Sequence, residues 1–331
     1  MNTLEYRSWN DFYEKHKEAH ILQSCRWGEL KERYGWKPRR IINSGCGAQI
    51  LFRKLPFGFS IGYIPKGPVG ILTSKFFEEL DAVCENENAI VLFIEPDQPV
   101  DEFNADPYRQ NQFQKTNIQF QPHRTIEVSL KGSQGEWLGR MKQKTRYNIR
   151  LAKKKEIVVE SSHDISEFNN LMAITGERDA FGVHDPSYYK TVFKLFQQTG
   201  NCRLLIAKYR QESLAAILVF KRGSRAWYFY GASSNIERNR MPTYLLQWEG
   251  MKWAAKSKCT SYDLWGIPDD EESVLEEDFL KRGDGLWGVY RFKRGFGGEV
   301  VQSAHTYQKI YRPGLFSIFS FLLKIRRRSL G

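Results

Sequence analysis

Aromatic and basic side chains alternate in a short segment near the C-terminus that could bind a nucleic acid. The segment runs from Tyr290 to Gly298 and reads YRFKRGFGG. Aromatic rings stack on unpaired bases and cations contact phosphates, so this composition suits the single-stranded end of a nucleic acid. The alternation also fits an ordinary strand with Tyr290 and Phe292 buried and Arg291 and Lys293 exposed. Both interpretations predict a strand that is broken by glycine.

A second basic segment, Glu136–Lys155, has the pattern of an amphipathic helix. Apolar residues recur at helical spacing along it, and cations recur every fourth residue on another face. These cations are Lys142, Arg146, Arg150 and Lys154. Stacked like charges repel one another, which costs stability unless an anion neutralises them. The pattern therefore predicts either an anion-binding face or a solvated helix face.

The net charge points to a polyanionic partner. The chain has 331 residues, with 50 Lys and Arg against 38 Asp and Glu, which gives a net charge of +12. Three segments carry more than the whole of this excess, namely Trp137–Lys155, Lys281–Phe296 and the tail from Lys324. Such local basicity is typical of proteins that bind nucleic acid, anionic lipid or a phosphate-rich substrate.

The sequence offers no recognised metal or cofactor site. It has no Walker A motif and no H-E-x-x-H pair, and its six histidines lack ligand spacing. Its five cysteines form no C-x-x-C pair, so we expect no metal, no organic cofactor and no disulfide framework. The polar N-terminus and the lack of an apolar run of about 18 residues favour a cytoplasmic protein.

Predicted elements repeat at about half the chain length. The first set comprises strands at Arg39–Asn43, Ala48–Lys54, Phe59–Ile64 and Ala89–Ile94, with a helix at Thr73–Asn88 before the last strand. The second set comprises strands at Arg203–Tyr209, Leu214–Lys221, Ala226–Tyr230 and Ser261–Trp265, with a helix at Pro242–Ser257. Tyr63 matches Tyr230 at an offset of about 167 residues. We therefore expect two α/β domains with mixed sheets: residues 1–150 completed by 305–331, and residues 151–304.

This order of strands and helix is the layout of the GNAT acyltransferase fold. In acyl-CoA enzymes of that fold, a glycine-rich loop before the central helix holds pyrophosphate with backbone N–H groups. The matching segment here, Arg238–Thr243, has no glycine, and Pro242 has no N–H to donate. Lys66–Gly70 in the first repeat also departs from the pattern. The sequence therefore disfavours acyl-CoA as a donor and favours another activated acyl carrier.

Six segments between Leu22 and Glu299 resemble the FemABX family of peptidyltransferases. They read LQSCRWGELKERYGW, IGYIPKGPV, KTRYNIRLAKKK, YFYGASSNIERNRMPTYLLQWEGMKWA, YDLWGIP and YRFKRGFGGE, in the expected order. The resemblance implies two tandem GNAT-like domains, here without the coiled-coil arm that longer members carry. It also implies transfer of an amino acid from aminoacyl-tRNA to an amine of a peptidoglycan precursor peptide. Aminoacyl-tRNA is then a co-substrate, and no other cofactor is needed.

The resemblance also assigns residues to the donor. It implies that Phe292 and Lys293 contact the terminal adenosine and the reacting ester, with Lys293 stabilising the oxyanion and the leaving oxygen. The neighbouring cations Arg291 and Arg294 and the helix cations Arg146, Arg150 and Lys154 would bind RNA. Glu95, at a strand end, is a candidate base. The alternatives for Glu95 are a carboxylate that binds the acceptor peptide and a solvated side chain.

For the acceptor, the Gln23-Ser24-x-x-Trp27-x-x-x-Lys31 stretch resembles the diphosphate contact of the family, with Lys31 as ligand. The second ligand would be His184, or Arg178 nearby, so a UDP-MurNAc-pentapeptide and lipid II both stay open as acceptors. Tyr228 and Tyr230 would line a strand that faces the cleft, or else pack in the core. Seven acids between Asp269 and Asp278 predict a mobile surface loop.

The C-terminal tail has a membrane-like pattern. An apolar stretch, Leu315–Leu323, is followed by the basic run from Lys324, which suits a helix lying on the inner membrane leaflet. The alternative is a final helix packed on the first domain. We expect a monomer. Two other functions stay open: an N-acyltransferase that uses a different carrier-bound donor and amine, and a non-catalytic RNA- or membrane-binding protein.

Overall fold

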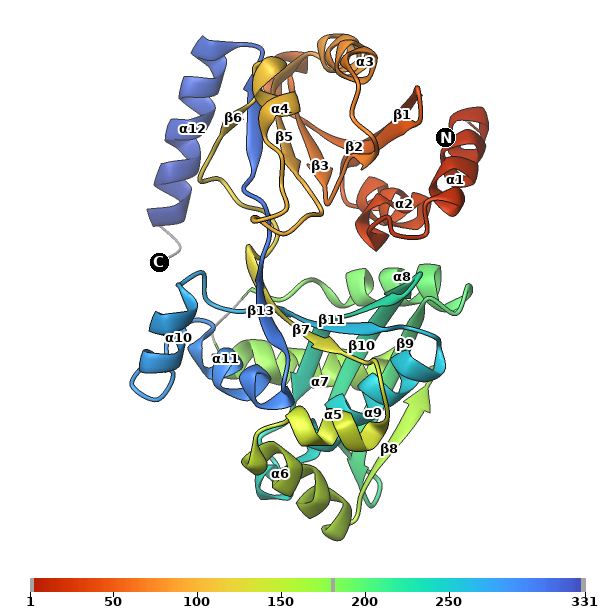
Figure 1. Cartoon of the computed structure of the whole chain (residues 1–331), viewed down its shortest axis with the longest axis vertical. Helices are drawn as coiled ribbons and strands as arrows, with labels where there is room; N and C mark the ends of the chain where they lie inside the picture. The colour runs from red at the N-terminus through yellow and green to blue at the C-terminus, as the bar shows by residue number, and fades with distance from the viewer. Residues whose placement is uncertain (1–2, 180–181, 329–331) are drawn as a thin grey trace. The chain divides into compact units, whose positions relative to one another are not determined.

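The chain forms two units, and it passes between them twice (Figure 1). A computed structural model describes the backbone of residues 3–179 and 182–328 and the side chains of residues 4–178 and 182–322. Unit 1 comprises Met1–His123 and Ser303–Gly331, and unit 2 comprises Arg124–Gln302. The expected boundary at 150 was therefore wrong, whereas the one expected at 304 lies within two residues of the observed one, and the C-terminal segment completes unit 1 as expected. Residues 124–150 belong to unit 2 because their first strand pairs with two strands of that unit.

Unit 1 is a mixed sheet in the order β1-β2-β3-β5-β14-β6, with β4 paired to β2. Its strands are β1 (Trp36–Asn43), β2 (Cys46–Lys54), β3 (Ser60–Pro65), β4 (Val69–Gly70), β5 (Ala89–Glu95), β6 (Gln114–Lys115) and β14 (Tyr307–Ile310). Its helices are α1 (Thr3–Lys15), α2 (Cys25–Arg33), α3 (Ser74–Asn86), α4 (Asp106–Gln110) and α12 (Pro313–Arg328), with 3-10 turns η1 (Ile21–Gln23) and η2 (Pro56–Gly58).

Unit 2 is a second mixed sheet, in the order β13-β7-β12-β11-β10-β9-β8. Its strands are β7 (Arg124–Ser129), β8 (Ile157–Ser162), β9 (Cys202–Tyr209), β10 (Glu212–Arg222), β11 (Arg225–Ser233), β12 (Ser261–Gly266) and β13 (Glu299–Gln302). Its helices are α5 (Gln134–Arg140), α6 (Gln143–Lys154), α7 (Ile165–Asp179), α8 (Pro186–Gln197), α9 (Pro242–Lys256), α10 (Glu272–Asp278) and α11 (Trp287–Lys293), with 3-10 turns η3 (Arg238–Arg240) and η4 (Arg294–Phe296).

The two sheets share one plan, which confirms the internal repeat. In each, three antiparallel strands lead to a helix and then to a parallel fourth strand: β3 pairs with β5 around α3, and β11 pairs with β12 around α9. In each, the fourth strand also pairs with an antiparallel strand from a distant part of the chain, β14 in unit 1 and β7 in unit 2. The predicted repeat strands and helices were therefore right to within a few residues.

Polar side chains cap two helices of unit 1. Ser24 caps α2, since its hydroxyl oxygen accepts a hydrogen bond from the Trp27 N–H at 3.2 Å. Thr73 caps α3 in the same way through the Phe76 N–H at 3.2 Å. Each helix then buries an apolar face, with Phe76 and Phe77 of α3 in the core of unit 1.

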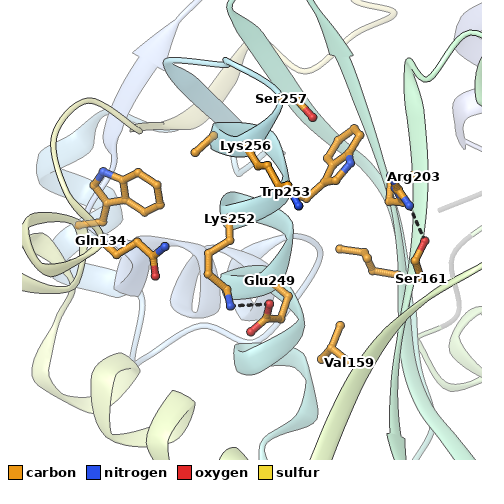
Figure 2. Close-up of a pocket in the computed structure, with 12 residues that line it drawn as sticks. Gln134, Val159, Ser161, Arg203, Glu249, Lys252, Trp253, Lys256 and Ser257 are labelled. Carbon is orange, nitrogen blue, oxygen red and sulfur yellow. Dashed lines mark hydrogen bonds and ion pairs between the residues drawn. The ribbon is translucent and has the colours of Figure 1, made fainter.

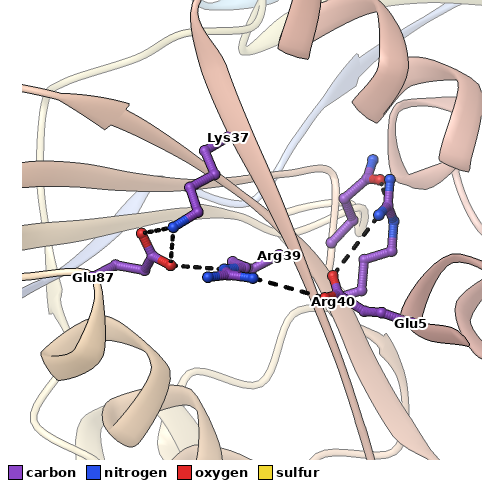
Figure 3. A network of polar contacts seen from close by, with 6 residues as sticks. Glu5, Lys37, Arg39, Arg40 and Glu87 are labelled. Atoms are coloured by element: carbon purple, nitrogen blue, oxygen red, sulfur yellow. Dashed lines mark hydrogen bonds and ion pairs between the residues drawn. The ribbon is translucent and has the colours of Figure 1, made fainter. Parts of the chain in front are cut away.

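A charged network ties the edge of the first sheet to two helices (Figure 3). Glu87, just after α3, accepts hydrogen bonds from Lys37 and Arg39 of β1, each at 2.7 Å. Arg39 and the buried Arg40 also lie within 4 Å of Glu5 of α1, at 3.9 and 3.8 Å. Burial alone would raise the pKa of Glu87, but the two cations outweigh it, so this pKa is lowered.

Three segments of unit 2 differ from the expected structure. Residues 290–296 form the end of α11 and the turn η4, not a strand, because Trp287, Tyr290 and Lys293 are buried at the three-residue spacing of a helix. Residues 136–155 form two helices, because Met141 is extended and the Lys142 N–H bonds the Gly295 carbonyl at 2.9 Å. The acidic segment contains helix α10, which is anchored by the fully buried Leu275.

Candidate functional site

Lys293 is buried at the end of α11. Its side chain is 5% exposed, and its ammonium group donates a hydrogen bond to the Gly266 carbonyl, at the end of β12, at 2.8 Å. The same ammonium lies 5.6 Å from the centre of the Tyr228 ring. Burial lowers the pKa of Lys293 to about 7, although the charge of Asp263 on β12 acts in the opposite direction. A lysine of this kind can both hold and release a proton near neutral pH.

The aromatic residues around Lys293 pack on one another. Phe292 is half-buried, and its ring lies 5.0 Å from that of Tyr244 on α9 and 5.1 Å from that of Phe296. Arg291, on the opposite side of the helix turn, is exposed. The segment therefore presents one exposed cation and a partly exposed aromatic group beside a buried lysine.

Arg294 forms an ion pair with the acidic helix α10, so its charge is not free for RNA. Its guanidinium group pairs with both carboxylate oxygens of Glu276, one of them at 2.7 Å, and lies 3.8 Å from the centre of the Phe279 ring. Tyr290 donates a hydrogen bond to the same carboxylate at 2.6 Å. At the other end, Arg124 pairs with Asp269 at 3.3 Å and with Glu271. The acidic segment is therefore fixed to unit 2 by ion pairs, which corrects the expectation of a mobile loop.

The helix cations have two kinds of surroundings. Arg146 is half-buried and donates to the carbonyl oxygens at the end of α5, including Leu138 at 3.3 Å. Arg150 and Lys154 of α6 are exposed, with Arg150 donating only back to the Arg146 carbonyl among the hydrogen bonds described here. Arg146 therefore stabilises the break between α5 and α6, whereas Arg150 and Lys154 present their charges to solvent.

Tyr228 and Tyr230 lie on opposite faces of the second sheet. Tyr230 is opposite Leu218 and Tyr228 is opposite Val219, because a bulge adds one residue to β11 at this point. Tyr228 packs in the core beneath α9 and α11, and its hydroxyl occupies space that a side chain at Gly231 would need. The expectation that both tyrosines face one cleft was therefore wrong. Burial raises the pKa of Tyr228 to about 12, so it stays protonated.

Tyr230 belongs to an aromatic cluster on the α8 face. Its hydroxyl is 3.3 Å from that of Tyr188, and the exposed His184 ring stacks on Tyr188 with centroids 3.9 Å apart. The structure thus brings the predicted residues His184 and Tyr230 together. Arg178, the alternative to His184, donates to the Ser233 carbonyl at 3.0 Å. Phe181, within the same predicted stretch, lies outside the described residues.

Glu95 is buried at the end of β5 and is held by four donors. One oxygen accepts from the backbone N–H groups of Phe120 and Gln121 at 2.7 and 3.1 Å and from the Thr306 hydroxyl at 3.4 Å. The other oxygen accepts from the Tyr63 hydroxyl. The side chain is 5% exposed, so the alternative of a solvated carboxylate was wrong. Glu95 fixes the segment 120–121 against the sheet.

Lys31 lies on α2 beside a second cation. Its ammonium group is 5.0 Å from the centre of the Trp27 ring. Arg53 of β2 donates to the carbonyl of Tyr34, the residue that ends α2, at 3.0 Å. Burial and then the charge of Arg53 lower the pKa of Lys31 to about 8. Lys31 in the last turn of α2 and Arg53 on β2 therefore place two cations near each other, an arrangement suited to an anion.

Sequence reasoning missed an aromatic row on this sheet face. Trp36, Tyr63, Phe120 and Phe93 follow one another, with ring centroids 6.4, 4.5 and 5.3 Å apart. Strand alternation could have found it, since Tyr63 and Phe93 are direct partners in the parallel pair β3–β5. The row connects the Arg53 end of the sheet with the Tyr63–Glu95 pair.

The turn before α9 lacks the donors of a pyrophosphate loop. The N–H groups of Arg240 and Met241 bond to the carbonyls of Glu237 and Arg238 at 2.9 and 3.1 Å, within the turn η3 itself. Pro242 begins the helix without an N–H. Two N–H groups of this turn are therefore used within the turn itself, and Pro242 offers none.

Comparison with known proteins decides the family. The model of the FemAB family matches residues 4–121, 112–210 and 197–324. The chain belongs to the FemAB family. This FemAB protein is 25% identical over 389 aligned residues to the lipid II:glycine glycyltransferase of Staphylococcus aureus (strain USA300), covering 90% of this chain and 92% of the relative. The alignment is longer than this chain, so the relative has residues with no counterpart here.

Solved structures confirm the fold of this FemAB protein. A crystal structure of FemX matches with a TM-score of 0.81 at 22% identity, covering 95% of this chain and 98% of that one. A tandem GNAT protein from the clavulanic acid pathway matches with a TM-score of 0.51 at 9% identity, covering 93% and 95%. The two units are therefore tandem GNAT-like domains. The longest helix described has 16 residues, so the described part of the chain has no long coiled-coil arm.

Proposed function

We propose that this FemAB protein transfers an amino acid from aminoacyl-tRNA to an amine on the stem peptide of a peptidoglycan precursor. The observation that carries this proposal is the match to a lipid II:glycine glycyltransferase along 90% of the chain. The product would be the first residue of an interpeptide bridge. Lipid II is the acceptor that this relative's name favours over a UDP-linked precursor.

The reaction is aminolysis of an ester. The acceptor amine attacks the aminoacyl carbonyl, a C–N bond forms, and the bond from the carbonyl carbon to the ribose oxygen breaks. The amine loses one proton and the leaving ribose oxygen gains one, so the reaction balances without a further co-reactant. Because the ester is already activated, the protein contributes chiefly alignment and charge stabilisation.

Lys293 is the residue that we assign to the reacting ester. Its protonated form would stabilise the oxyanion and pass a proton to the ribose oxygen, which its pKa of about 7 permits at neutral pH. Phe292, beside it, offers a partly exposed ring for the terminal base of the tRNA. The Gly266 carbonyl accepts a hydrogen bond from the ammonium, and the charge of Asp263 favours its protonated form.

Among the cations predicted to bind RNA, the exposed ones suit the phosphate backbone best. These are Arg291, Arg150 and Lys154. Arg294 and Arg146 instead bind groups of the protein itself, so we assign them to positioning α10 and α5.

The acceptor would bind on unit 1. Lys31, with Arg53 beside it, suits the diphosphate of the precursor, and the aromatic row suits its less polar parts. His184 and Tyr230 of unit 2 are further candidate precursor contacts. Glu95 is 5% exposed, and its two oxygens already accept hydrogen bonds from four donors of the protein, so a substrate amine has little access to it. We therefore assign Glu95 to positioning and leave the proton of the amine to water or substrate.

Helix α12 supports contact with the inner membrane leaflet. Phe316 packs against Phe93 of the first sheet, whereas Ile318, Phe321 and Leu322 are 59%, 64% and 58% exposed. An apolar face of this kind suits the boundary between lipid headgroups and acyl chains. The basic side chains from Lys324 onward lie outside the described side chains. No helix in the described part of the chain is long and apolar enough to cross a membrane.

The transfer assay tests the proposed function directly. The purified protein is incubated with tRNA charged with a radiolabelled amino acid and with lipid II or the UDP-linked pentapeptide. We expect label in the peptide, and Lys293→Met should reduce turnover by about 100-fold or more. Lys190→Met, at an exposed lysine on α8, is the matched control and should keep full activity. Absence of transfer with every charged tRNA would overturn the proposal.

Membrane contact needs its own measurement. We expect the protein to co-float with vesicles that contain phosphatidylglycerol, and Phe321→Glu should reduce the bound fraction severalfold because it places a charge in the apolar face. Ile71→Glu is the control, since Ile71 is 83% exposed but lies away from α12 in the sequence and on no apolar helix face. Equal flotation of both variants would contradict the role of α12.

A further inference from the structure

Unit 2 has an open groove alongside the C-terminal half of α9, which we call the α9 groove (Figure 2). Its volume of about 810 Å³ lies within the range of about 300–1,000 Å³ typical of ligand sites. One wall is α9 with Lys252, Trp253 and Lys256, and the other is formed by β8 and β9 with Ser161 and Arg203. The groove is lined by residues that none of the roles above uses.

The side chains in the α9 groove combine cations with an aromatic ring. Arg203 donates to the Ser161 hydroxyl at 2.8 Å, and its guanidinium carbon lies 5.8 Å from the centre of the Trp253 ring. Lys252 pairs with Glu249 at 2.7 Å, whereas Lys256 is exposed. The groove therefore has three cations and one acid around a half-buried tryptophan. Cations next to an aromatic ring are the combination that binds phosphates beside bases.

The groove is part of a larger basic region at one end of the second sheet. The residues are Arg203, Lys221, Arg225, Lys252, Lys256 and Lys258, whereas the neighbouring Arg222 is buried. Hydrogen bonds join the chain segments that carry these residues. The Lys221 N–H donates to the Asn201 carbonyl at 2.9 Å, and the thiol of Cys259, just after α9, donates to the Arg225 carbonyl at 3.6 Å. Glu249 is the one acid within the segments 201–203, 221–225 and 249–258. These three segments therefore carry a clear excess of positive charge.

The groove lies apart from the reacting lysine but on the same helix. Tyr244, near the start of α9, packs on Phe292 beside Lys293. Lys256 ends the same helix twelve residues later, which is about 18 Å along the axis at 1.5 Å per residue. The exposed cations Arg150 and Lys154 are on α6, which packs against α9. One extended polyanion could contact all of these cations together.

We propose that the α9 groove binds the sugar-phosphate backbone of the tRNA, at a distance from its aminoacylated end. Lys252, Lys256 and Arg203 would contact phosphates, and Trp253 would contact a ribose or base. A concave groove with an aromatic wall fits a nucleic-acid strand, whereas a lipid surface is flat and would leave Trp253 and Arg203 unused. The inference rests on the proposed function, because it takes tRNA as the donor.

The test compares two lysine pairs with the same spacing and charge. Lys252→Gln/Lys256→Gln alters the groove, and Lys190→Gln/Lys194→Gln alters exposed lysines on α8, a helix that is absent from the groove lining. Binding of fluorescent, uncharged tRNA is measured by anisotropy over a range of salt concentrations. We expect the groove variant to bind about tenfold more weakly and to lose about two units of salt slope, with the control unchanged.

Parallel measurements separate this inference from the proposed function. In the transfer assay, the groove variant should raise the KM for charged tRNA and change kcat much less, because the reacting ester is distant. If the wild-type protein transfers the amino acid and the groove variant binds tRNA as tightly as the control variant does, the groove inference is overturned and the proposed function stands. If the groove variant loses binding to phosphatidylglycerol vesicles but keeps its tRNA binding, the groove inference is overturned in favour of a membrane-binding surface. A wild-type protein that binds no tRNA would overturn both proposals.

Discussion

Lys293 donates a hydrogen bond from a buried ammonium group to the carbonyl oxygen of Gly266 at 2.8 Å. The helix α11 thus ends with its one buried cation turned toward the end of β12, and the charge of Asp263, within the same strand, favours the protonated lysine. Burying a charge in this way is unfavourable for folding, so the lysine that we assign to the reaction lowers the free energy of unfolding when it is protonated.

The burial of Lys293 predicts that the effect of Lys293→Met on stability depends on pH. Between about pH 7 and the ordinary lysine pKa of 10.5, the unfolded chain binds a proton at this residue that the folded chain lacks. The free energy of unfolding of the wild type should therefore rise relative to that of the variant by about 1.4 kcal/mol per pH unit. Melting of both proteins from pH 6 to pH 10 measures this, and a constant difference would show that Lys293 is not perturbed.

Arg294 and Arg150 should respond in opposite ways to loss of charge. Arg294→Gln removes the pairing with Glu276, whose side chain is 42% exposed, so we expect a loss of only about 1 kcal/mol. For a unit of this size that is about 2–4 °C in melting temperature, with little change in tRNA affinity. Arg150→Gln should instead weaken tRNA binding at an unchanged melting temperature. The reverse pattern would contradict the roles assigned to the two residues.

Gly231 is predicted to be essential for the position of Tyr228. A Cβ at Gly231 would lie 2.0 Å from the Tyr228 hydroxyl, so Gly231→Ala must displace the ring that faces Lys293. We expect a loss of about 1–3 kcal/mol in stability together with reduced turnover. Gly139→Ala on α5 meets no atom within 4 Å and should gain up to about 1 kcal/mol. Full activity of Gly231→Ala would show that the Tyr228 ring is not needed beside Lys293.

Tyr63→Phe tests the buried Glu95 site of unit 1. The hydroxyl donates to Glu95 and accepts from Gln121 at 3.2 Å, so its removal leaves buried polar groups without a partner. We expect a loss of about 1–3 kcal/mol, read from the denaturant midpoint. Tyr147→Phe is the control, since Tyr147 is 58% exposed. Equal midpoints in the two variants would mean that Glu95 keeps the segment 120–121 in place without Tyr63.

Short-range patterns predicted much of the fold. Hydrophobic periodicity and turn residues located the repeat strands, and the helix predicted from Thr73 agrees with α3, which Thr73 caps. Family motifs spread over the chain were sufficient to predict the tandem architecture that the FemX structure confirms. These signals survive in a single sequence because each depends on neighbours within a few residues.

Long-range packing decided what the sequence could not. Four alternating residues, from Tyr290 to Lys293, suggested a strand, but burial of Trp287, Tyr290 and Lys293 on one side made it a helix. A single bulge placed Tyr228 and Tyr230 on opposite faces, although period-two spacing put them on one.

By itself, the sequence determined two repeated α/β units, their family and an excess of basic charge. The tertiary structure decided which charges are available. It paired Arg294 with Glu276, buried Lys293, and brought cations of β9 and α9 together in one groove. The physical reason is that periodicity and capping act along the chain, whereas pairing, burial and charge clustering depend on residues that meet only after folding.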